Sequence, residues 1–267
     1  MRAIEAIPRV LREFAEHPGR SMTLADDDGL TRHLDRRMCV VAGPSFGVVT
    51  SIDTTESDLV NLLADVRGLI PEGVRTDWYL GPSMRPAGLA DKLLALGLRV
   101  PEDGSDTLDA LLLADEPSGV AEDVETHEVT TMSDFTDAAE VRWEAFQLGE
   151  EEREHQRGFL AAHYEGYLRG KDRSMISVVA TVDGRVAGAA SAILSSHGLF
   201  LIGGATAPWA RHRGVYRALV GARWRYAVDR GTPALAVHAI PDTSSPVLRG
   251  MGFVHVCAMR HLEGRPT

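Results

Sequence analysis

The stretch PWARHRGVYRAL, residues 208–219, is the most informative part of this chain. It follows an apolar, strand-like segment and opens an amphipathic helix, whose first backbone N–H groups have no partner within the helix. Arg211, Arg213 and Arg217 surround Gly214, which lets an anion approach the backbone closely. The stretch therefore predicts an anion-binding turn at the positive end of a helix. The alternative is a solvated basic turn that only caps the helix.

Around this stretch, the second half of the chain has the pattern β-α-α-β-β-β-α-β-α-β. Asp183-Gly184 predicts a type I′ turn that joins residues 177–182 and 185–194 into a hairpin, followed by a third strand over 199–207. Ser133 is predicted to cap a helix whose apolar face includes Phe146. Consecutive strands without intervening helices indicate an α+β type of fold, with a mixed, largely antiparallel sheet flanked by helices.

Two motifs in this half resemble landmarks of the GNAT superfamily of acyl-CoA N-acyltransferases. Arg211-x-x-Gly214-x-Tyr216 is similar to its pyrophosphate loop, Arg/Gln-x-x-Gly-x-Gly/Ala, and SSPVLRGMGF at residues 244–253 is similar to its later short helix with a Gly-Phe ending. A Walker loop and a dinucleotide fingerprint are both absent from the sequence. The resemblance implies a GNAT-like sheet, acetyl-CoA as co-substrate, and transfer of the acetyl group to a primary amine of a small molecule or peptide by direct attack.

The same resemblance implies a set of cofactor-binding residues. Backbone N–H groups from Arg213 to Arg217 would hold the pyrophosphate, and the strand edge over 204–207 would pair with the pantetheine arm. Because Tyr216 replaces the usual small residue, its phenol is expected to swing outward. The implied residues are Ala205, Thr206, Ala207, Arg211, Arg213, Gly214, Val215, Tyr216 and Arg217.

The acid and base of the implied reaction are harder to assign. Leu248 stands where many GNAT proteins have the tyrosine that protonates the departing thiolate, and residues 199–207 contain no carboxylate. His238 is a candidate base, although a histidine hydrogen-bonded within the sheet is the alternative that we favour. Ser244 could bind the thioester or cap its own helix, and we favour the cap. A second hypothesis is therefore an acyl-CoA-binding module with weak or no catalysis.

Other polar groups give weaker signals. Glu144 and the acidic run over 149–155 could line an entrance for a cationic amine, but charge runs usually form solvated helix faces. His255 and Cys257 are expected on one face of a strand, without a third ligand at metal-binding spacing. We therefore predict no metal site.

The first half is predicted to be a second α/β domain. A Pro/Gly/acid-rich stretch over 115–128 suggests a boundary between domains at 1–120 and 126–267. Residues 78–98 faintly repeat the strand, helix and Gly ending found at 235–253. No phosphate loop precedes them, so this half is either a degenerate GNAT-like repeat or an unrelated accessory domain.

Composition restricts the function class. The 267 residues are 44% hydrophobic and 25% charged, which is globular usage. A net charge of −10 and a pI of 5.5 disfavour nucleic acid as a partner. The sequence has no apolar run of membrane-spanning length and no apolar core of a signal peptide at its start. With 2 cysteines far apart in the sequence, we expect a cytoplasmic protein without disulfides; the oligomeric state is left open.

Overall fold

The computed structural model of the chain describes residues 4–25, 29–102, 104–121 and 123–264. Its strands are β1 (Thr31–Leu34), β2 (Met38–Gly43), β3 (Phe46–Ile52), β4 (Thr76–Leu80), β5 (Thr107–Leu113), β6 (Glu125–Glu128), β7 (Met175–Val182), β8 (Arg185–Ser195), β9 (Gly198–Thr206), β10 (Leu235–Ala239) and β11 (Val254–Gly264). Its α-helices are α1 (Arg9–Glu16), α2 (Leu59–Leu69), α3 (Leu89–Ala95), α4 (Met132–Ala145), α5 (Glu150–Arg157), α6 (Leu160–Gly170), α7 (Val215–Asp229) and α8 (Ser244–Arg249). Short 3-10 turns are η1 (Ile4–Ala6), η2 (Pro18–Arg20), η3 (Glu56–Asp58) and η4 (Pro208–Ala210).

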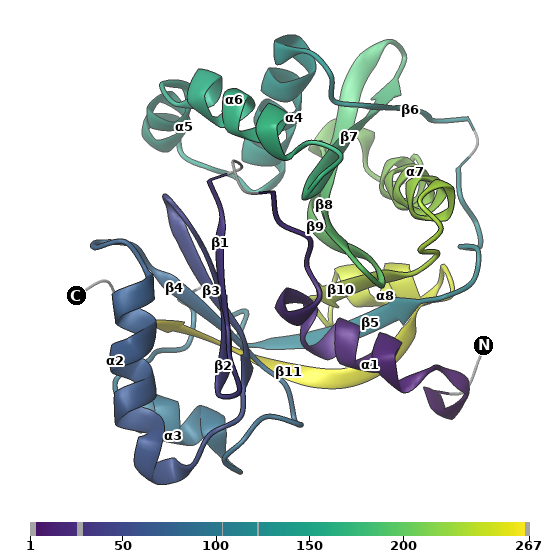
Figure 1. Cartoon of the computed structure of the whole chain (residues 1–267). Helices are drawn as coiled ribbons and strands as arrows, with labels where there is room; N and C mark the ends of the chain where they lie inside the picture. Colours follow the sequence, from purple (N-terminus) through teal and green to yellow (C-terminus); the bar gives the residue numbers. More distant parts are fainter. Residues whose placement is uncertain (1–3, 26–28, 103, 122, 265–267) are drawn as a thin grey trace.

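The eleven strands form one continuous sheet in the order β1-β2-β3-β4-β11-β5-β10-β9-β8-β7-β6 (Figure 1). Only β3–β4 and β9–β10 pair in parallel, and every other neighbouring pair is antiparallel. The central strands β5 and β10 are apolar on both faces because helices or loops cover both sides of the sheet there. The predicted mixed, largely antiparallel sheet is confirmed.

The second half contains the predicted elements with one additional helix, α5. The β7–β8 hairpin turns at Asp183 and Gly184, whose φ angles of 54° and 72° fit a type I′ turn. The cap of α4 differs from the prediction: Thr131 accepts from the Asp134 N–H, and the Asp134 side chain accepts from the Thr131 N–H. Phe146 is the C-cap of this helix and its side chain is 57% exposed. The prediction that it belongs to the buried apolar face is therefore wrong.

Helices α4 and α7 cover opposite faces of the second half of the sheet (Figure 1). The α4 side packs on Ala189 and Ala205, whereas Val215 and Leu219 of α7 pack on the face that carries Ala190. Position 188 has no room for a side chain, since an ideal Cβ on Gly188 would lie 2.4 Å from a Val215 methyl group. The start of α7 is therefore held close against β8.

The two halves exchange strands at the centre of the sheet. β11, from the end of the chain, lies between β4 and β5, while β5, from the first half, lies between β11 and β10. Strands β1 and β5 were not predicted as strands. Each half therefore contributes one strand to the other half, and the predicted division at 1–120 and 126–267 remains an expectation from sequence.

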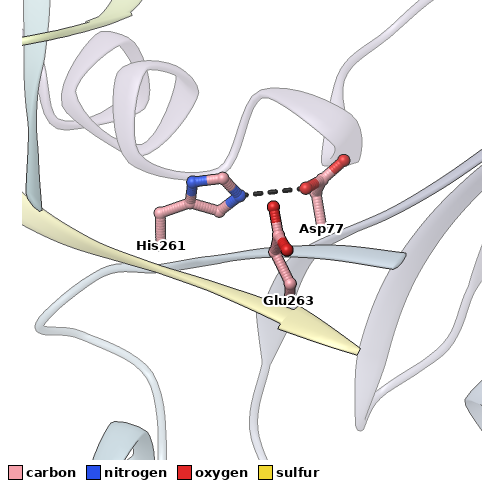
Figure 2. A group of neighbouring side chains, drawn as sticks. All are labelled: Asp77, His261 and Glu263. Carbon is pink, nitrogen blue, oxygen red and sulfur yellow. Dashed lines mark hydrogen bonds and ion pairs between the residues drawn. The ribbon is translucent and has the colours of Figure 1, made fainter. Parts of the chain in front are cut away.

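Polar side chains also join the halves where β4 pairs with β11. His261 Nε2 lies 3.0 Å from Asp77 Oδ1, and Glu263 is the cross-strand partner of Asp77 (Figure 2). Arg75 lies 2.9 Å from Glu263 Oε1, so the two carboxylates and the two basic groups form one network.

Candidate functional site

A gap opens between β9 and β10. The two strands pair only at Leu199–Leu235 and Phe200–Ala236, after which they separate. β9 also carries a β-bulge, because Ala189 pairs with Ala205 while Ser191 pairs with Ile202, and Gly203 adopts a φ of 57°. Beyond the bulge, β9 therefore has a free edge that an extended ligand can pair with.

The start of α7 lies at the end of this gap. Gly214 precedes the helix with a φ of 79°, and the backbone N–H groups of Val215, Tyr216 and Arg217 have no partner within the helix. The side chain of exposed Arg211 makes no hydrogen bond or ion pair with any described residue, and only its backbone N–H has a partner, Pro208 O. A cavity of about 350 Å³ lies beside these groups, lined by Thr206, Ala210, Arg211, His212, Gly214, Val215, Tyr216, Arg217 and Val247. Free donors and an unpaired cation suit this cavity to an anion.

Six of the nine predicted cofactor-binding residues line this cavity, and three do not. Ala205 and Ala207 are buried, and the Ala207 N–H donates to Ala187 O. Arg213 turns away from the cavity and lies 3.0 Å from Asp183 Oδ2 in the β7–β8 turn. His212, Ala210 and Val247 line the cavity without having been predicted.

Tyr216 does not swing outward as expected. Its ring packs inward against Gly204, where an ideal Cβ would come within 2.9 Å of the ring, and against the apolar core. Burial raises the pKa of the phenol, so it stays protonated at neutral pH. Gly204 therefore provides the space that the larger side chain at position 216 needs.

The connection between the halves packs on the same turn. An ideal Cβ at Gly214 would lie 2.5 Å from Ala121 Cβ, and Arg217 Nη1 donates to Gly119 O. This contact has no local sequence signal, because the composition of residues 115–128 is typical of a linker. Gly214 is needed for its left-handed backbone and for this packing, as well as for access by a ligand.

Leu248 is completely buried in the core together with Phe253, and it has no proton to donate. Ser244 Oγ accepts from the Ile240 N–H at 2.9 Å, so its side chain stabilises the loop that precedes α8. The cap position of this helix is occupied by Thr243 and not by Ser244. The neighbouring Ser245 Oγ donates to Asp109 Oδ2 at 2.6 Å. Sequence reasoning missed this bond because Asp109 belongs to β5 of the first half.

His238 lies on β10 beside Phe200 and Tyr79. Its Nε2 donates to Ala15 O of α1 at 2.9 Å, which leaves Nδ1 as the unprotonated nitrogen of the neutral ring. Burial lowers the pKa of His238 to about 4, so the ring is neutral but only weakly basic at neutral pH. This environment favours the structural role over general-base catalysis.

The weaker candidates lie away from this cavity. Glu144 lines a separate hollow of about 560 Å³ between α4 and the β7–β8 turn. The acidic run forms exposed helix α5, in which Glu150 and Glu154 pair with Arg157. His255 and Cys257 do not share a face as predicted, because a β-bulge between them places them opposite Leu111 and Ala110, which point to opposite faces.

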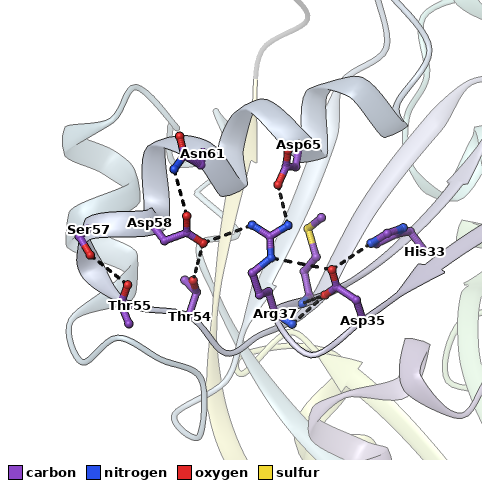
Figure 3. Close-up of polar contacts among 10 residues, drawn as sticks. His33, Asp35, Arg37, Thr54, Thr55, Ser57, Asp58, Asn61 and Asp65 are labelled. Carbon is purple, nitrogen blue, oxygen red and sulfur yellow. Dashed lines mark hydrogen bonds and ion pairs between the residues drawn. The ribbon is translucent and has the colours of Figure 1, made fainter.

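The described part of the first half has a corresponding gap, but no phosphate-binding turn. β3 and β4 pair in parallel over three residues and then diverge, and His17 bridges the gap by donating from Nδ1 to Thr50 O and accepting at Nε2 from Ser83 Oγ. The turn η3, which leads into the helix that follows β3, carries the acidic residues Glu56 and Asp58. Asp58, and Asp65 further along this helix, both pair with Arg37 (Figure 3). Carboxylates at this position repel a diphosphate.

The Asp77–His261–Glu263 cluster is a possible donor set for a divalent cation. One ligand atom from each residue lies within 4.8 Å of the others, and His261 Nδ1 faces Ser105 O, as in many metal-bound histidines. The Arg75 guanidinium already lies 2.9 Å from Glu263 Oε1 and 3.7 Å from Asp77 Oδ1, so a cation there competes with Arg75 for the two carboxylates. The sequence could not reveal this cluster, because its members lie on strands from different halves.

No helix among the described residues is long and apolar enough to cross a bilayer. Neither a protein-family model nor a curated protein matches the sequence.

Solved structures match the chain over nearly its full length. A GCN5-related N-acetyltransferase from Kribbella flavida has a TM-score of 0.63 and 12% identity, covering 97% of this chain and 96% of its own. A conserved protein of unknown function from Staphylococcus epidermidis has a TM-score of 0.62 and 13% identity, covering 99% and 100%. A tandem GNAT protein from the clavulanic acid biosynthesis pathway has a TM-score of 0.58 and 12% identity, covering 100% and 90%. At these identities the similarity is one of fold, and it extends across both halves.

Proposed function

Because this chain has the tandem GNAT fold, we propose that it is an acyl-CoA-dependent N-acyltransferase. Its C-terminal half transfers an acetyl or related acyl group from acetyl-CoA to a primary amine of a small molecule or peptide. The observation that carries the proposal is the coincidence of free amides, an unpaired Arg211 and an open strand edge around one cavity. The acidic turn η3 that precedes α2 in the first half argues for one CoA site per chain.

In this proposal, the N–H groups of Val215, Tyr216 and Arg217 bind the diphosphate, and the guanidinium of Arg211 adds charge. The free edge of β9 at Gly204–Thr206 pairs with the amides of the pantetheine arm, which brings the thioester to the bulge. Cys39 and Cys257 carry free thiols, which fits the expected reducing cytoplasm.

Direct attack by an amine requires a proton to leave the nucleophile and one to reach the departing thiolate. Tyr216 is a protonated phenol on the cavity wall and packs on Gly204. We assign to it the protonation of the departing thiolate, because Leu248 cannot act as the acid. With His238 only weakly basic, water carries the first proton to solvent.

The second candidate function is acyl-CoA binding without catalysis. Two observations favour it: the buried Leu248 has no proton to donate, and burial lowers the pKa of His238 to about 4, which makes it a weak base at neutral pH. A binding module would retain the cavity and the free amides while lacking proton transfer.

A binding measurement and a turnover measurement separate these functions. Acetyl-CoA or CoA should raise the melting temperature by mass action, and ATP and NAD should do so much less. Thiol release from acetyl-CoA across a panel of amines then tests turnover. Absence of a shift with either CoA species refutes both functions, and a shift without thiol release favours the binding module.

A further inference from the structure

One buried and one partly buried arginine flank the bulge of β9, and neither has a carboxylate partner among the described residues. Arg223 of α7 is only 1% exposed, and Arg142 of α4 is partly buried on the opposite face of the sheet. Among the described residues, neither guanidinium has an Asp or Glu oxygen within 4.0 Å. Buried cations are normally paired, because removing a charge from water is costly. The pair therefore leaves net positive charge inside the protein.

The hydrogen bonds of the two guanidiniums explain part of their presence. Arg142 donates from Nε to Gly203 O at 3.3 Å and from Nη2 to Ser191 Oγ at 2.8 Å. Arg223 donates from Nη1 to Ser191 O at 3.1 Å and from Nε to Leu219 O at 3.0 Å. They thus bind polar groups at the irregular part of the β8–β9 ladder, which a neutral amide donor could also do.

What hydrogen bonding leaves unexplained is the charge. Arg223 Nη2 is buried without a hydrogen-bond partner, and no described group bonds to Arg142 Nη1. Burial lowers the pKa of both guanidiniums to about 10, and both still remain cationic at neutral pH. The phenols of Tyr167 and Tyr216 lie near these guanidiniums but are neutral at that pH, so they do not balance the charge. Among the described residues, no negatively charged group balances the two guanidiniums at the β9 bulge.

We propose that a substrate carboxylate supplies this charge, binding Arg142 directly at the β9 bulge while buried Arg223 acts through its field. The inference rests on the proposed function, which brings the acyl group to Gly203 and Gly204. Arg142 is the contact residue because it is partly exposed, whereas Arg223 is enclosed. The carboxylate belongs either to an acyl group derived from a dicarboxylic acid or to an amino-acid acceptor.

Two arms of one experiment distinguish these sources. In the donor arm, calorimetry compares S-(2-carboxyethyl)-CoA with S-propyl-CoA, which have the same chain length and differ in the carboxylate. In the acceptor arm, kcat/KM with acetyl-CoA compares α-amino acids with the amines formed by removing their carboxyl group. We expect a preference of about 10- to 100-fold for the carboxylate in one arm, the usual effect of a charged hydrogen bond.

Variants attribute that preference to Arg142. Arg142→Gln keeps a donor for the bulge and should remove the preference while leaving the affinity for S-propyl-CoA unchanged. Arg142→Lys should retain part of it, because the charge remains without the planar fork. Arg32→Gln is the matched control: Arg32 also donates to backbone carbonyls, at Gly19 and Met22, in the first half, and its loss should change nothing.

The two arms measured on the wild-type protein are enough to contradict the inference, so the test does not depend on whether a variant folds. If CoA species bind but neither arm shows a carboxylate preference, the inference is wrong and the proposed function stands. If Arg142→Gln weakens S-(2-carboxyethyl)-CoA and S-propyl-CoA equally, Arg142 is only structural and the inference is also wrong. If no CoA species binds, the proposed function fails and the inference fails with it.

Discussion

Reversing the charge of Arg211 isolates the electrostatic part of diphosphate binding. The side chain of Arg211 is exposed, lines the cavity and makes no bond with any described residue, so Arg211→Glu should leave the unliganded protein unchanged. Gly214→Asp is a poorer test, because any side chain at Gly214 would also collide with Ala121.

The expected loss of affinity follows from Coulomb's law. A unit charge about 4 Å from a phosphate contributes about 1 kcal/mol in water, so exchanging a cation for an anion costs about 2 kcal/mol, or about 30-fold in Kd. At a CoA concentration about 100 times the wild-type Kd, binding adds about 2.7 kcal/mol to the wild type and about 0.9 kcal/mol to the variant. For a chain of this size, the shift in melting temperature should fall from about 5 °C to about 2 °C.

Differential scanning fluorimetry with and without CoA measures both shifts. Arg36→Glu is the control, because the side chain of Arg36 is also exposed, makes no bond with any described residue and lies in the β1–β2 turn at the other end of the sheet. The difference between variant and wild type should shrink in high salt, since salt screens exposed charges. An undiminished shift in Arg211→Glu, or an equal drop in Arg36→Glu, would refute the placement of the diphosphate.

Three further predictions concern the acid, the buried histidine and the strand exchange. Tyr216→Phe should lower kcat for thiol release by about 10-fold or more while CoA still raises the melting temperature, and an unchanged kcat excludes Tyr216 as the acid. Because burial lowers the pKa of His238 to about 4, the free energy of unfolding of the wild type should fall as the pH falls from about 6.5 towards 4. In urea titrations, His238→Gln should remove up to about 3 kcal/mol of this loss. Identical pH profiles of the two proteins would contradict this prediction. Because β11 lies between β4 and β5, fragments 1–120 and 126–267 should each lack a cooperative thermal transition when expressed alone and recover one when co-expressed. Independent cooperative unfolding of either fragment would argue against a shared core.

Local signals in the sequence were sufficient for much of the second half. Asp183-Gly184 adopts the positive φ angles of the predicted turn, and α8 spans Ser244–Arg249 as expected. Six of the implied cofactor residues surround one cavity because they lie within one strand end, one turn and one helix start, so chain geometry alone keeps them together. The cap of α4 was misplaced by two residues because Thr131 and Ser133 offer equivalent hydroxyls, and Asp134 decides between them.

By itself, then, the sequence determined the strand-turn-helix unit over 198–229 and the chemistry of its free amides, since short-range backbone preferences and helix-end dipoles depend only on neighbouring residues. The tertiary structure decided the exchange of β5 and β11, the inward packing of Tyr216 on Gly204, and the meeting of Arg142 and Arg223 at one bulge. These features join residues far apart in the chain. Such contacts are selected by the burial of shared surface and by hydrogen bonds across the sheet, for which a single sequence carries no local pattern.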